Sequence, residues 1–496
     1  MDRRDFIKGA SGLGIVTALG AAPRSDLIRQ ENAKPGTTDW MLTHTKVDAI
    51  TQYRCPWIEG YCSRTSVKAG ETLDIKVSTK PASKFTIDFY RLGYYGGLGG
   101  RHMDRVGPFA GSPQPDPPVG SVRVRECDWE TSHRLTIPAD WPSGVYLGKH
   151  TEEREKLQSY VVFIVKDDRP CDFLFQCSDT TWAAYNRWPD FFSLYDDGTP
   201  PHNWYTGPGV AVSFDRPYGK YRQILDAPLS QGSGEFLLWE FPLAFWMEQQ
   251  GYDVSYISNI DSHADPARLL KAKAFLSVAH DEYWSLGMYQ NVQRAIDSGV
   301  HAAFFGGNSV DGVLDIRASA AGAPNRVIER IGKFGGIKSE RERNYEKEKG
   351  WKEHGPLPAL LMGAGTTSPA NGSADWTCTS DKHWLFAGTG MKNGDAIKEL
   401  VGWEHHGPPL NTIEGLEVLA RGSITSRGRP QNTEYTSVIF PGPKNNLVFN
   451  AATIWWSDGL SAPPGYLRPS AHGGTPPGPD ERVQKITTNL FDKFLS

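Results

Sequence analysis

The hydrophobic pattern of this chain changes at Pro170, and this change limits the folds that the chain can adopt. Before Pro170, short segments alternate apolar and polar residues between Gly, Pro and Ser turns, which is typical of strands with one buried face. After Pro170, apolar runs are unbroken, and most are separated by segments long enough for helices. A chain of 496 residues also exceeds the size of a single core. We therefore predict an all-β domain over residues 51–168 and an α/β domain over residues 169–496.

The first domain is predicted to be an immunoglobulin-like β-sandwich, because six or seven short strands fit into about 115 residues. The alternation is carried by the segments SVKAGETLDIKVS, KFTIDFYRL, SVRVREC, HRLTIPADW, GVYLGKH and SYVVFIVKDD. The glycine-rich segment 91–103 is most simply a wide turn, with a ligand-binding loop as the alternative.

The second domain is predicted to contain a mostly parallel sheet with helices on both faces. Its apolar runs are CDFLFQCS, YDVSYISN, AFLSVA, HAAFFGGN and NLVFNAAT. Right-handed crossovers would bring the carboxyl ends of the parallel strands to one edge. A last helix is predicted near the C-terminus, where Val483, Ile486, Leu490 and Phe494 recur at helical spacing.

The first 25 residues have the layout of a twin-arginine export signal, with Arg3 and Arg4 before a short, weakly apolar run. The alternative is a frayed amphipathic N-terminus. A signal of this type predicts a periplasmic or secreted protein, and it favours a bound cofactor because the route exports folded proteins. Residues 26–50 are polar without a sustained period and are predicted to be a linker.

Composition excludes several function classes. A net charge of −4 gives no electrostatic basis for binding nucleic acid or an anionic membrane, and after the N-terminal signal no apolar run is long enough to span a bilayer. The six cysteines form no CxxC pair, and the GxSxG, HExxH, Walker and GxGxxG motifs are absent. The expected partner is therefore a small-molecule substrate.

Polar residues follow all five predicted strands, which would bring them to the carboxyl edge of the sheet, where open α/β sheets bind ligands. The third strand is followed by His280, Asp281, Glu282, Tyr283 and Trp284, and the last by Trp455, Trp456 and Asp458. The candidates after the other strands are Asp179, Tyr185, Asn186, Asp261 and Asn308. Each has a structural alternative: Asp179, Asp261 and Ser285 could cap helices, and Asn308 could occupy a left-handed turn.

These residue types predict catalysis at that edge. His280 or Glu282 could act as general acid or base, and Tyr283 could bind a metal or donate a proton. Asn308 could hold a developing oxyanion. Glu404, beside two histidines, is a candidate metal ligand, with a surface carboxylate as the alternative. Asp179, Tyr185, Asn186, Asp261 and Trp284 are the candidate substrate-binding residues.

A series of motifs from about Ile58 to Trp456 resembles the family of the large (β) subunit of N,N-dimethylformamidase. The motifs include FYRLGYYGGLGGR, WPSGVYLGK, SDTTWAAYNRW, GYDVSYISNIDSH, HDEYWS, FFGGN and VGWEHH. The resemblance implies a sandwich followed by a glutamine-amidotransferase-like (flavodoxin-like) α/β domain. It also implies a mononuclear iron held by two tyrosines and a glutamate, and hydrolysis of a small amide.

The resemblance assigns one iron ligand and leaves two open. Tyr283 matches the tyrosine that follows His-x-Glu in the family. Tyr252 and Tyr185 are the candidates for the second tyrosine, and the candidates for the glutamate are Glu340, Glu342 and Glu404.

Two hypotheses follow from these features. The first is an exported, metal-dependent hydrolase of a C–N bond in a small linear amide, not a peptide bond. The second is a non-catalytic cell-envelope protein that binds carbohydrate or another ligand on stacking tryptophans. The tryptophans considered for this role are Trp182, Trp188, Trp284, Trp455 and Trp456.

Overall fold

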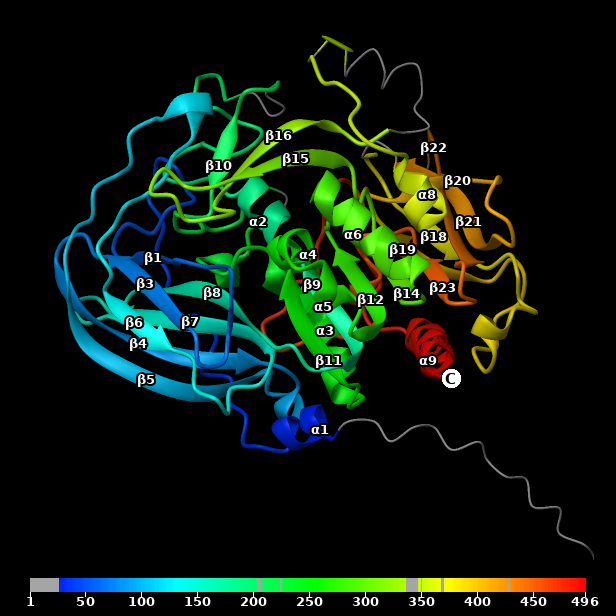
Figure 1. Cartoon of the computed structure of the whole chain (residues 1–496), viewed down its shortest axis with the longest axis horizontal. Coiled ribbons are helices and arrows are strands. Elements are labelled where there is room, and N and C mark those ends of the chain that lie inside the picture. Colours follow the sequence, from blue (N-terminus) through cyan, green and yellow to red (C-terminus); the bar gives the residue numbers. More distant parts are fainter. Residues whose placement is uncertain are drawn as a thin grey trace, which may run out of the picture.

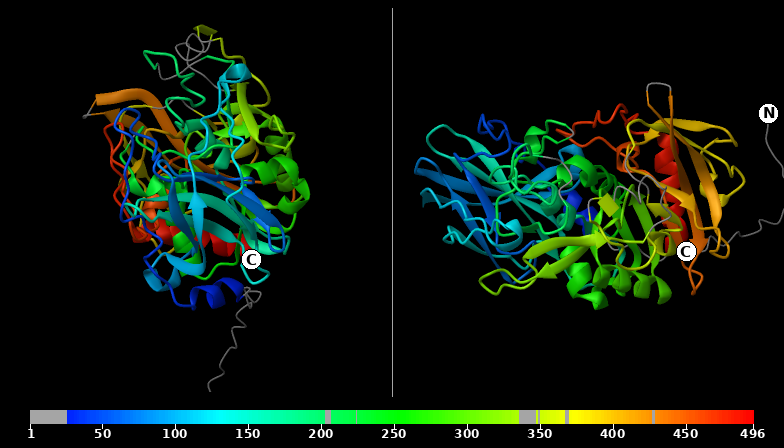
Figure 2. Two further views of the ribbon diagram at one scale, coloured as in Figure 1. Left: turned by 90° about the vertical axis from the view of Figure 1, so that its left-hand side faces the viewer. Right: turned by 90° about the horizontal axis from the view of Figure 1, so that it is seen from above.

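The computed structural model describes residues 26–202, 207–223, 225–335, 347–348, 350–366, 370–426 and 429–496. The predicted export signal and the candidate ligands Glu340 and Glu342 lie outside these residues. Figure 1 shows an all-β part, a central part in which helices flank a sheet, and further strands beside the C-terminal helix. Seen from above in Figure 2, the all-β part and the late strands lie at opposite ends of the molecule. Among the described helices, none has the length and apolarity needed to cross a bilayer.

The all-β part consists of two sheets that share one hydrophobic core. One sheet has the order β1-β3-β6 and the other β2-β8-β7-β4-β5. Their bounds are β1 Glu59–Cys62, β2 Ser66–Lys68, β3 Thr72–Ser78, β4 Ser83–Leu92, β5 Gly100–Gly111, β6 His133–Thr136, β7 Gly144–Glu152 and β8 Gln158–Lys166. Most predicted strands are present, and the immunoglobulin-like topology stays a prediction. The strand predicted at SVRVREC is wrong, because Val122 and Arg123 adopt φ angles of 46° and 61° that break an extended chain.

The central sheet has the order β11-β9-β12-β14-β23-β22-β21. The first five strands are parallel neighbours, and the last two are antiparallel. The bounds are β9 Cys171–Cys177, β11 Val254–Ser258, β12 Ala272–Ala279, β14 His301–Gly306, β21 Glu417–Ser426, β22 Arg429–Pro441 and β23 Leu447–Asn450. The five predicted apolar runs form the five parallel strands, so the mixed α/β class is confirmed. The glutamine-amidotransferase-like relationship stays a prediction.

Helices connect and cover these strands (Figure 1). The bounds are α1 Leu27–Asn32, α2 Asp179–Tyr185, α3 Phe241–Gln249, α4 Asn259–Ala264, α5 Pro266–Leu269, α6 Leu286–Asp297, α8 Pro358–Met362 and α9 Glu481–Leu495. The prediction of the last helix is confirmed: its apolar face is buried, and Phe491 packs 4.3 Å from the ring of Phe173 in β9. A π-helical turn, Phe236–Glu240, precedes α3 without a break.

Smaller sheets surround the central one. A four-stranded sheet has the order β10-β16-β15-β13, and two-stranded sheets pair β17 with β20 and β18 with β19. The bounds are β10 Ala211–Ser213, β13 Tyr283–Ser285, β15 Gly312–Arg317, β16 Val327–Lys333, β17 Ala364–Thr366, β18 Ala374–Thr377, β19 Ala396–Val401 and β20 His406–Pro409. Only His280 to Glu282 separate β12 from β13, so the four-stranded sheet begins where a parallel strand ends.

Residues 26–50, expected to be a linker, pack at the junction of the two large parts. Trp40 is fully buried, and α1 contributes Glu31 to a cluster of buried charges. In that cluster, Arg91 of β4 forms an ion pair of 2.8 Å with Glu248 of α3, and both side chains are fully buried. A buried pair of this kind fixes the relative position of the elements that it joins. All six cysteines are buried and free.

Candidate active site

The chain turns sharply where β12 ends. Ala279 has a φ of 55°, a left-handed conformation that is unfavourable for a residue with a Cβ and is often found at functional sites. The five polar and aromatic residues after it point in two directions. Asp281 accepts hydrogen bonds from Gln176, Ser277 and Asn259, and Trp284 packs against Phe275. His280, Glu282 and Tyr283 gather on the other side.

His280 lies among three glutamates, and all four side chains are buried. Its Nδ1 is 3.1 Å from Oε2 of Glu235. Its Nε2 is 3.1 Å from Oε2 of Glu404 and 3.4 Å from Oε2 of Glu282. Neither Nε2 nor the Glu404 oxygen has a hydrogen bond of good geometry within the described part of the chain. Two buried polar atoms therefore face each other without an aligned partner, which points to a group that binds between them.

Three tyrosine hydroxyls gather on the other side of Glu282. The hydroxyl of Tyr185 donates to one carboxylate oxygen of Glu282 at 2.6 Å, and that of Tyr195 donates to the other at 3.1 Å. The hydroxyls of Tyr185 and Tyr195 are 2.9 Å apart. Tyr195 is also hydrogen-bonded to the hydroxyl of Tyr283. Glu282 thus joins the tyrosine group to the His280 group.

A cation lies behind Tyr283. Nη1 of Arg330 donates to its hydroxyl at 3.4 Å, and the guanidinium packs 4.3 Å from the ring centroid of Trp351. Asp311 lies 3.8 Å from the guanidinium. Tyr283 belongs to an apolar cluster through its ring, but its hydroxyl meets polar groups only.

The end of β14 reaches the same region. A Cβ on Gly307 would lie 2.1 Å from the carbonyl oxygen of Glu404, so only glycine permits this approach. His406 holds the segments together, because its Nε2 accepts from the backbone N–H of Ser309 at 2.9 Å. Asn308 lies between these contacts with a φ of 54°, the left-handed conformation considered for it. This turn does not conflict with the predicted oxyanion-holding role of Asn308, because it brings the residue beside the Glu404 segment.

The other candidate residues serve the structure around the site. Asp179 accepts from the backbone N–H of Asn259 at 2.7 Å, and Asn186 bonds the backbone of Pro217 and Gly219. Asp261 forms a capping box with Ser258 at the start of α4. Asp179, Asn186 and Asp261 thus have structural contacts, Trp284 lies in the core, and a substrate-binding role for these four residues stays a prediction. Tyr252, a candidate for the second iron ligand, packs against Phe173 and Phe491 instead.

Mutual electrostatics set the protonation of this cluster. Burial lowers the pKa of His280, but the charges of Glu404, Glu235 and Glu282 outweigh it and raise that pKa well above its ordinary value. Burial raises the pKa of Glu282, but His280, Tyr185 and Arg330 lower it below the usual range. The pKa of Glu404 is raised, because burial and the other carboxylates outweigh His280. The cluster therefore holds a charged imidazole beside at least one carboxylate.

Two sets of side chains could hold a metal ion, and they share Glu282. His280, Glu282 and Glu404 offer donor atoms that all lie within 4.8 Å of one another. Tyr185 and Tyr195 offer two hydroxyl oxygens 2.9 Å apart, which lie 2.6 and 3.1 Å from different carboxylate oxygens of Glu282. The second set has the residue types that the resemblance implies for iron, and hard oxygen donors suit a highly charged cation.

Comparisons with known proteins identify the family. The model of the N,N-dimethylformamidase beta subunit-like C-terminal family matches residues 86–470. The chain belongs to this family. No curated protein matches the chain. A superoxide reductase (neelaredoxin) from Ignicoccus hospitalis is 16% identical over 22% of this chain and 82% of its own, with a TM-score of 0.14, and this likeness carries no argument.

The sequence did not predict two residues of this cluster, Tyr195 and Glu235. Tyr195 lies in an irregular segment after α2, where no periodicity indicates the direction of a side chain. Glu235 precedes a segment that resembles an ordinary helix in sequence, and a π-helical turn changes which of its residues face the same way. The position of Tyr195 shortly after the polar strand end and helix of residues 171–185 is a weak sequence indication that it belongs to the site. No sequence feature indicates Glu235.

Proposed function

We propose that this protein hydrolyses the C–N bond of a small linear amide at the buried cluster around Glu282. The observation that carries the proposal is the convergence on one carboxylate of two tyrosine hydroxyls and a histidine flanked by glutamates. Membership of the dimethylformamidase-like family supports a hydrolase of small amides.

We propose iron as the cofactor, with Tyr185, Tyr195 and Glu282 as the ligands. Glu282 accepts hydrogen bonds from both tyrosine hydroxyls, and Tyr283 contacts Tyr195 from the far side. Bound iron would polarise the amide carbonyl and make water a better nucleophile near neutral pH. Burial and the nearby charge of Glu282 raise the pKa of all three phenols, so a cation bound at this position would help to favour their ionised form.

The remaining residues would handle protons and position the substrate. His280 carries a proton on a nitrogen that faces Glu404 and Glu282, so the imidazole can pass it to the departing amine nitrogen. Glu404 can accept the proton that the attacking water loses and pass it to His280, so that the proton given to the amine is replaced. The amide of Asn308, beside the Glu404 segment, is suited to hold the oxygen of the tetrahedral intermediate.

Two further points complete the proposal. Arg3 and Arg4 support export by the twin-arginine route to the periplasm or the medium.

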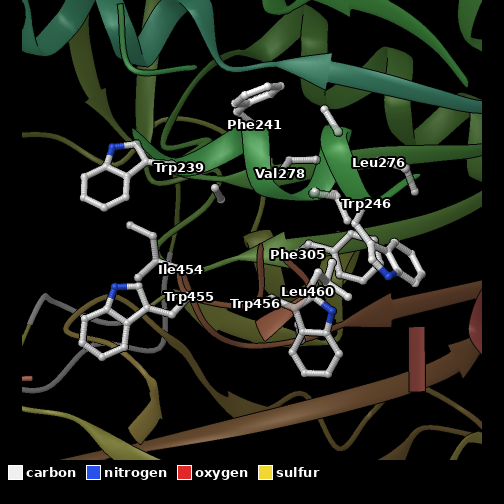
Figure 3. Close-up of a cluster of buried hydrophobic side chains, with 14 of the residues drawn as sticks. Trp239, Phe241, Trp246, Leu276, Val278, Phe305, Ile454, Trp455, Trp456 and Leu460 are labelled. Carbon is white, nitrogen blue, oxygen red and sulfur yellow. The ribbon is translucent and has the colours of Figure 1, made fainter. Parts of the chain in front are cut away.

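The alternative of a carbohydrate-binding protein loses its basis, because Trp188, Trp284, Trp455 and Trp456 are fully buried and Trp182 is 3% exposed. Figure 3 shows Trp455 and Trp456 packed among apolar side chains of the core. None of the five presents a face on which a sugar could stack.

The test combines metal analysis with an amide panel. Protein purified after export should contain stoichiometric iron, show a visible tyrosinate-to-iron absorption band, and release amine from small linear amides. Tyr185→Phe and Tyr195→Phe should each lose the band and most of the iron. Tyr289→Phe is the matched control, because this buried tyrosine bonds the backbone of Leu357 far from the cluster.

Two results would contradict the proposal. Absence of a stoichiometric transition metal would remove its chemical basis. Retention of metal in both tyrosine variants, together with its loss in His280→Gln, would place the ion between His280 and Glu404 instead.

A further inference from the structure

We propose that Glu235 is a positioning residue that holds the imidazole of His280 with Nε2 turned toward Glu282 and Glu404. Oε2 of Glu235 lies 3.1 Å from Nδ1 of His280, and both side chains are 2% exposed. The inference assigns the proton of this contact to Nδ1, with Oε2 as the acceptor that the Trp239 indole also uses. The inference rests on the proposed amide hydrolysis for its kinetic test, but the hydrogen bond itself can be observed without substrate.

The indole of Trp239 fixes the carboxylate in turn. Its Nε1 donates to the same Oε2 of Glu235 at 2.8 Å. The other oxygen, Oε1, has no hydrogen-bond partner among the residues that the structure describes. One oxygen therefore receives both bonds, and the indole and the imidazole determine its position together.

The backbone before the π-helical turn brings Glu235 to this place. A Cβ on Gly232 would lie 2.0 Å from the carbonyl oxygen of Tyr160, so the chain passes close to β8 only with glycine there. The backbone N–H groups of Leu238 and Trp239 then donate to the carbonyl of Glu235. At the other end of the turn, Glu240 accepts from the indole of Trp182 at 2.6 Å and does not contact a histidine.

This arrangement makes a specific prediction for Glu235→Gln. The Trp239 indole can only donate, so the amide oxygen of glutamine must take the place of Oε2 and the amide NH2 group that of Oε1. The glutamine oxygen can then accept from both partners, and the variant should keep most of the wild-type kcat. Glu235→Leu removes both bonds and should lower kcat by about 10- to 100-fold with little change in KM, as loss of such an orienting partner does elsewhere.

Trp239→Phe tests the orienting role of the indole. In the double variant Glu235→Gln with Trp239→Phe, the amide is free to flip and offer its NH2 group to Nδ1, which would make Nδ1 an acceptor and leave Nε2 with the single proton of a neutral ring, a proton that the ring does not readily give up. Its loss of kcat should therefore exceed the product of the two single losses. Glu240→Gln is the matched control, because it replaces a buried glutamate of the same turn.

A second readout keeps failure of this inference distinct from failure of the proposed function. The proton between Nδ1 and Glu235 should give a strongly downfield 1H resonance in the protein without substrate. The resonance should persist in Glu235→Gln and Glu240→Gln, and it should disappear in Glu235→Leu and His280→Gln. If wild type hydrolyses no small amide but shows this pattern, the positioning role stands and the proposed reaction does not.

Three results would overturn the inference. One is the absence of the resonance in wild type. Another is a loss of kcat in Glu235→Gln as large as that in Glu235→Leu, which would make the charge, not the bond, the contribution of Glu235. The third is wild-type kcat in folded Glu235→Leu. If Glu235→Leu does not fold, the downfield 1H resonance of the wild type and the kcat of the Glu235→Gln, Trp239→Phe double variant still test the positioning role.

Discussion

Two buried histidines in different parts of the molecule show what the surroundings do to the same side chain. His150 in β7 is fully buried, and neither ring nitrogen has a hydrogen-bond partner within the described residues. Burial lowers the pKa of His150 to about 3. His280 in the α/β part is buried to nearly the same extent, yet its pKa is raised well above the ordinary value because three carboxylates surround it.

The difference between the pKa values of His150 and His280 distinguishes a histidine that only fills space from one in a candidate active site. In the β part, an imidazole fills space between Phe85 and Gly60 and stays neutral. At the carboxyl edge of the parallel sheet, an imidazole of the same burial carries a charge that neighbouring segments keep in place. Burial alone therefore does not mark a site, and a raised histidine pKa beside converging carboxylates is the feature that singles out His280. The predictions below test this contrast, from the largest effect to the smallest.

Glu282→Gln should have the largest effect. This substitution removes the charge that both the tyrosine group and His280 use, so we expect a loss of amide hydrolysis of about 10²- to 10⁴-fold. Loss of bound iron should accompany it. Amine release and metal content measure the two effects.

Glu240→Gln is the control for this prediction. Burial raises the pKa of Glu240 well above its usual range, so its carboxyl group is neutral and glutamine is a close mimic. Activity in Glu282→Gln equal to that of the control would mean that the reaction occurs elsewhere.

The position of the site could be predicted because it depends on regular structure. Polar residues after β12 and β14 must meet at one edge once the strands are parallel, and this argument placed His280, Glu282, Tyr283 and Asn308 in the same region. Which side chain faces which partner depends on the local path of the backbone. Asp281 and Trp284 turn away because Ala279 adopts a left-handed conformation that no sequence pattern marks.

Other candidates have structural contacts that their sequence pattern does not indicate. Asn186 donates to the backbone carbonyl of Pro217, and Asp261 accepts from Ser66 of the β part. Both residues follow strands in the sequence, as Asn308 does. Their partners come from segments distant in sequence, so the pattern around each residue could not predict these contacts.

His150→Leu should change the pH dependence of stability. In the unfolded chain His150 binds a proton near pH 6.5, and in the folded protein only near pH 3. Its contribution to stability is therefore present above pH 6.5 and lost as the pH falls toward 3. Between pH 7 and 4.5 the wild type should lose about 3 kcal/mol through this group, and the variant should lack that loss.

Urea unfolding at the two pH values measures it, with the exposed His44→Gln as the control. If the change in unfolding free energy between the two pH values is the same in His150→Leu as in the wild type, the buried imidazole accepts a proton as readily as a free one.

Asp179→Asn should remove a pH dependence of stability whose sign is opposite to that of His150. Burial raises the pKa of Asp179 to about 7, whereas the unfolded carboxyl loses its proton near pH 3.8. The stabilising contribution is thus complete below pH 3.8 and lost as the pH rises through 7. Replacement by asparagine should remove a loss of about 2–3 kcal/mol between pH 5 and 7.

Unfolding free energies at these two pH values, with the exposed Asp140→Asn as the control, measure the effect. Because Asp179 lies in the α/β part but outside the Glu282 cluster, this pH dependence also tests whether the absence of a nearby opposite charge, not the choice of domain, sets the pKa of a buried group. A wild-type slope that Asp179→Asn leaves intact would refute that explanation.

Ser285→Ala should have the smallest effect and should separate stability from catalysis within one short segment. Ser285 follows Trp284 in the chain and caps α6, with its side chain accepting from the backbone N–H of Met288 at 3.1 Å. Loss of such a cap costs about 1 kcal/mol, so the urea midpoint should fall while kcat and iron content stay at wild-type values. The hydroxyl of Ser285 also contacts Nδ1 of His263, and His263→Gln distinguishes loss of this contact from loss of the cap. A fall in kcat of tenfold or more in Ser285→Ala would contradict the prediction. It would mean that the catalytic residues extend past Tyr283 to Ser285, because losing a helix cap worth about 1 kcal/mol of stability does not by itself lower kcat of the folded protein tenfold.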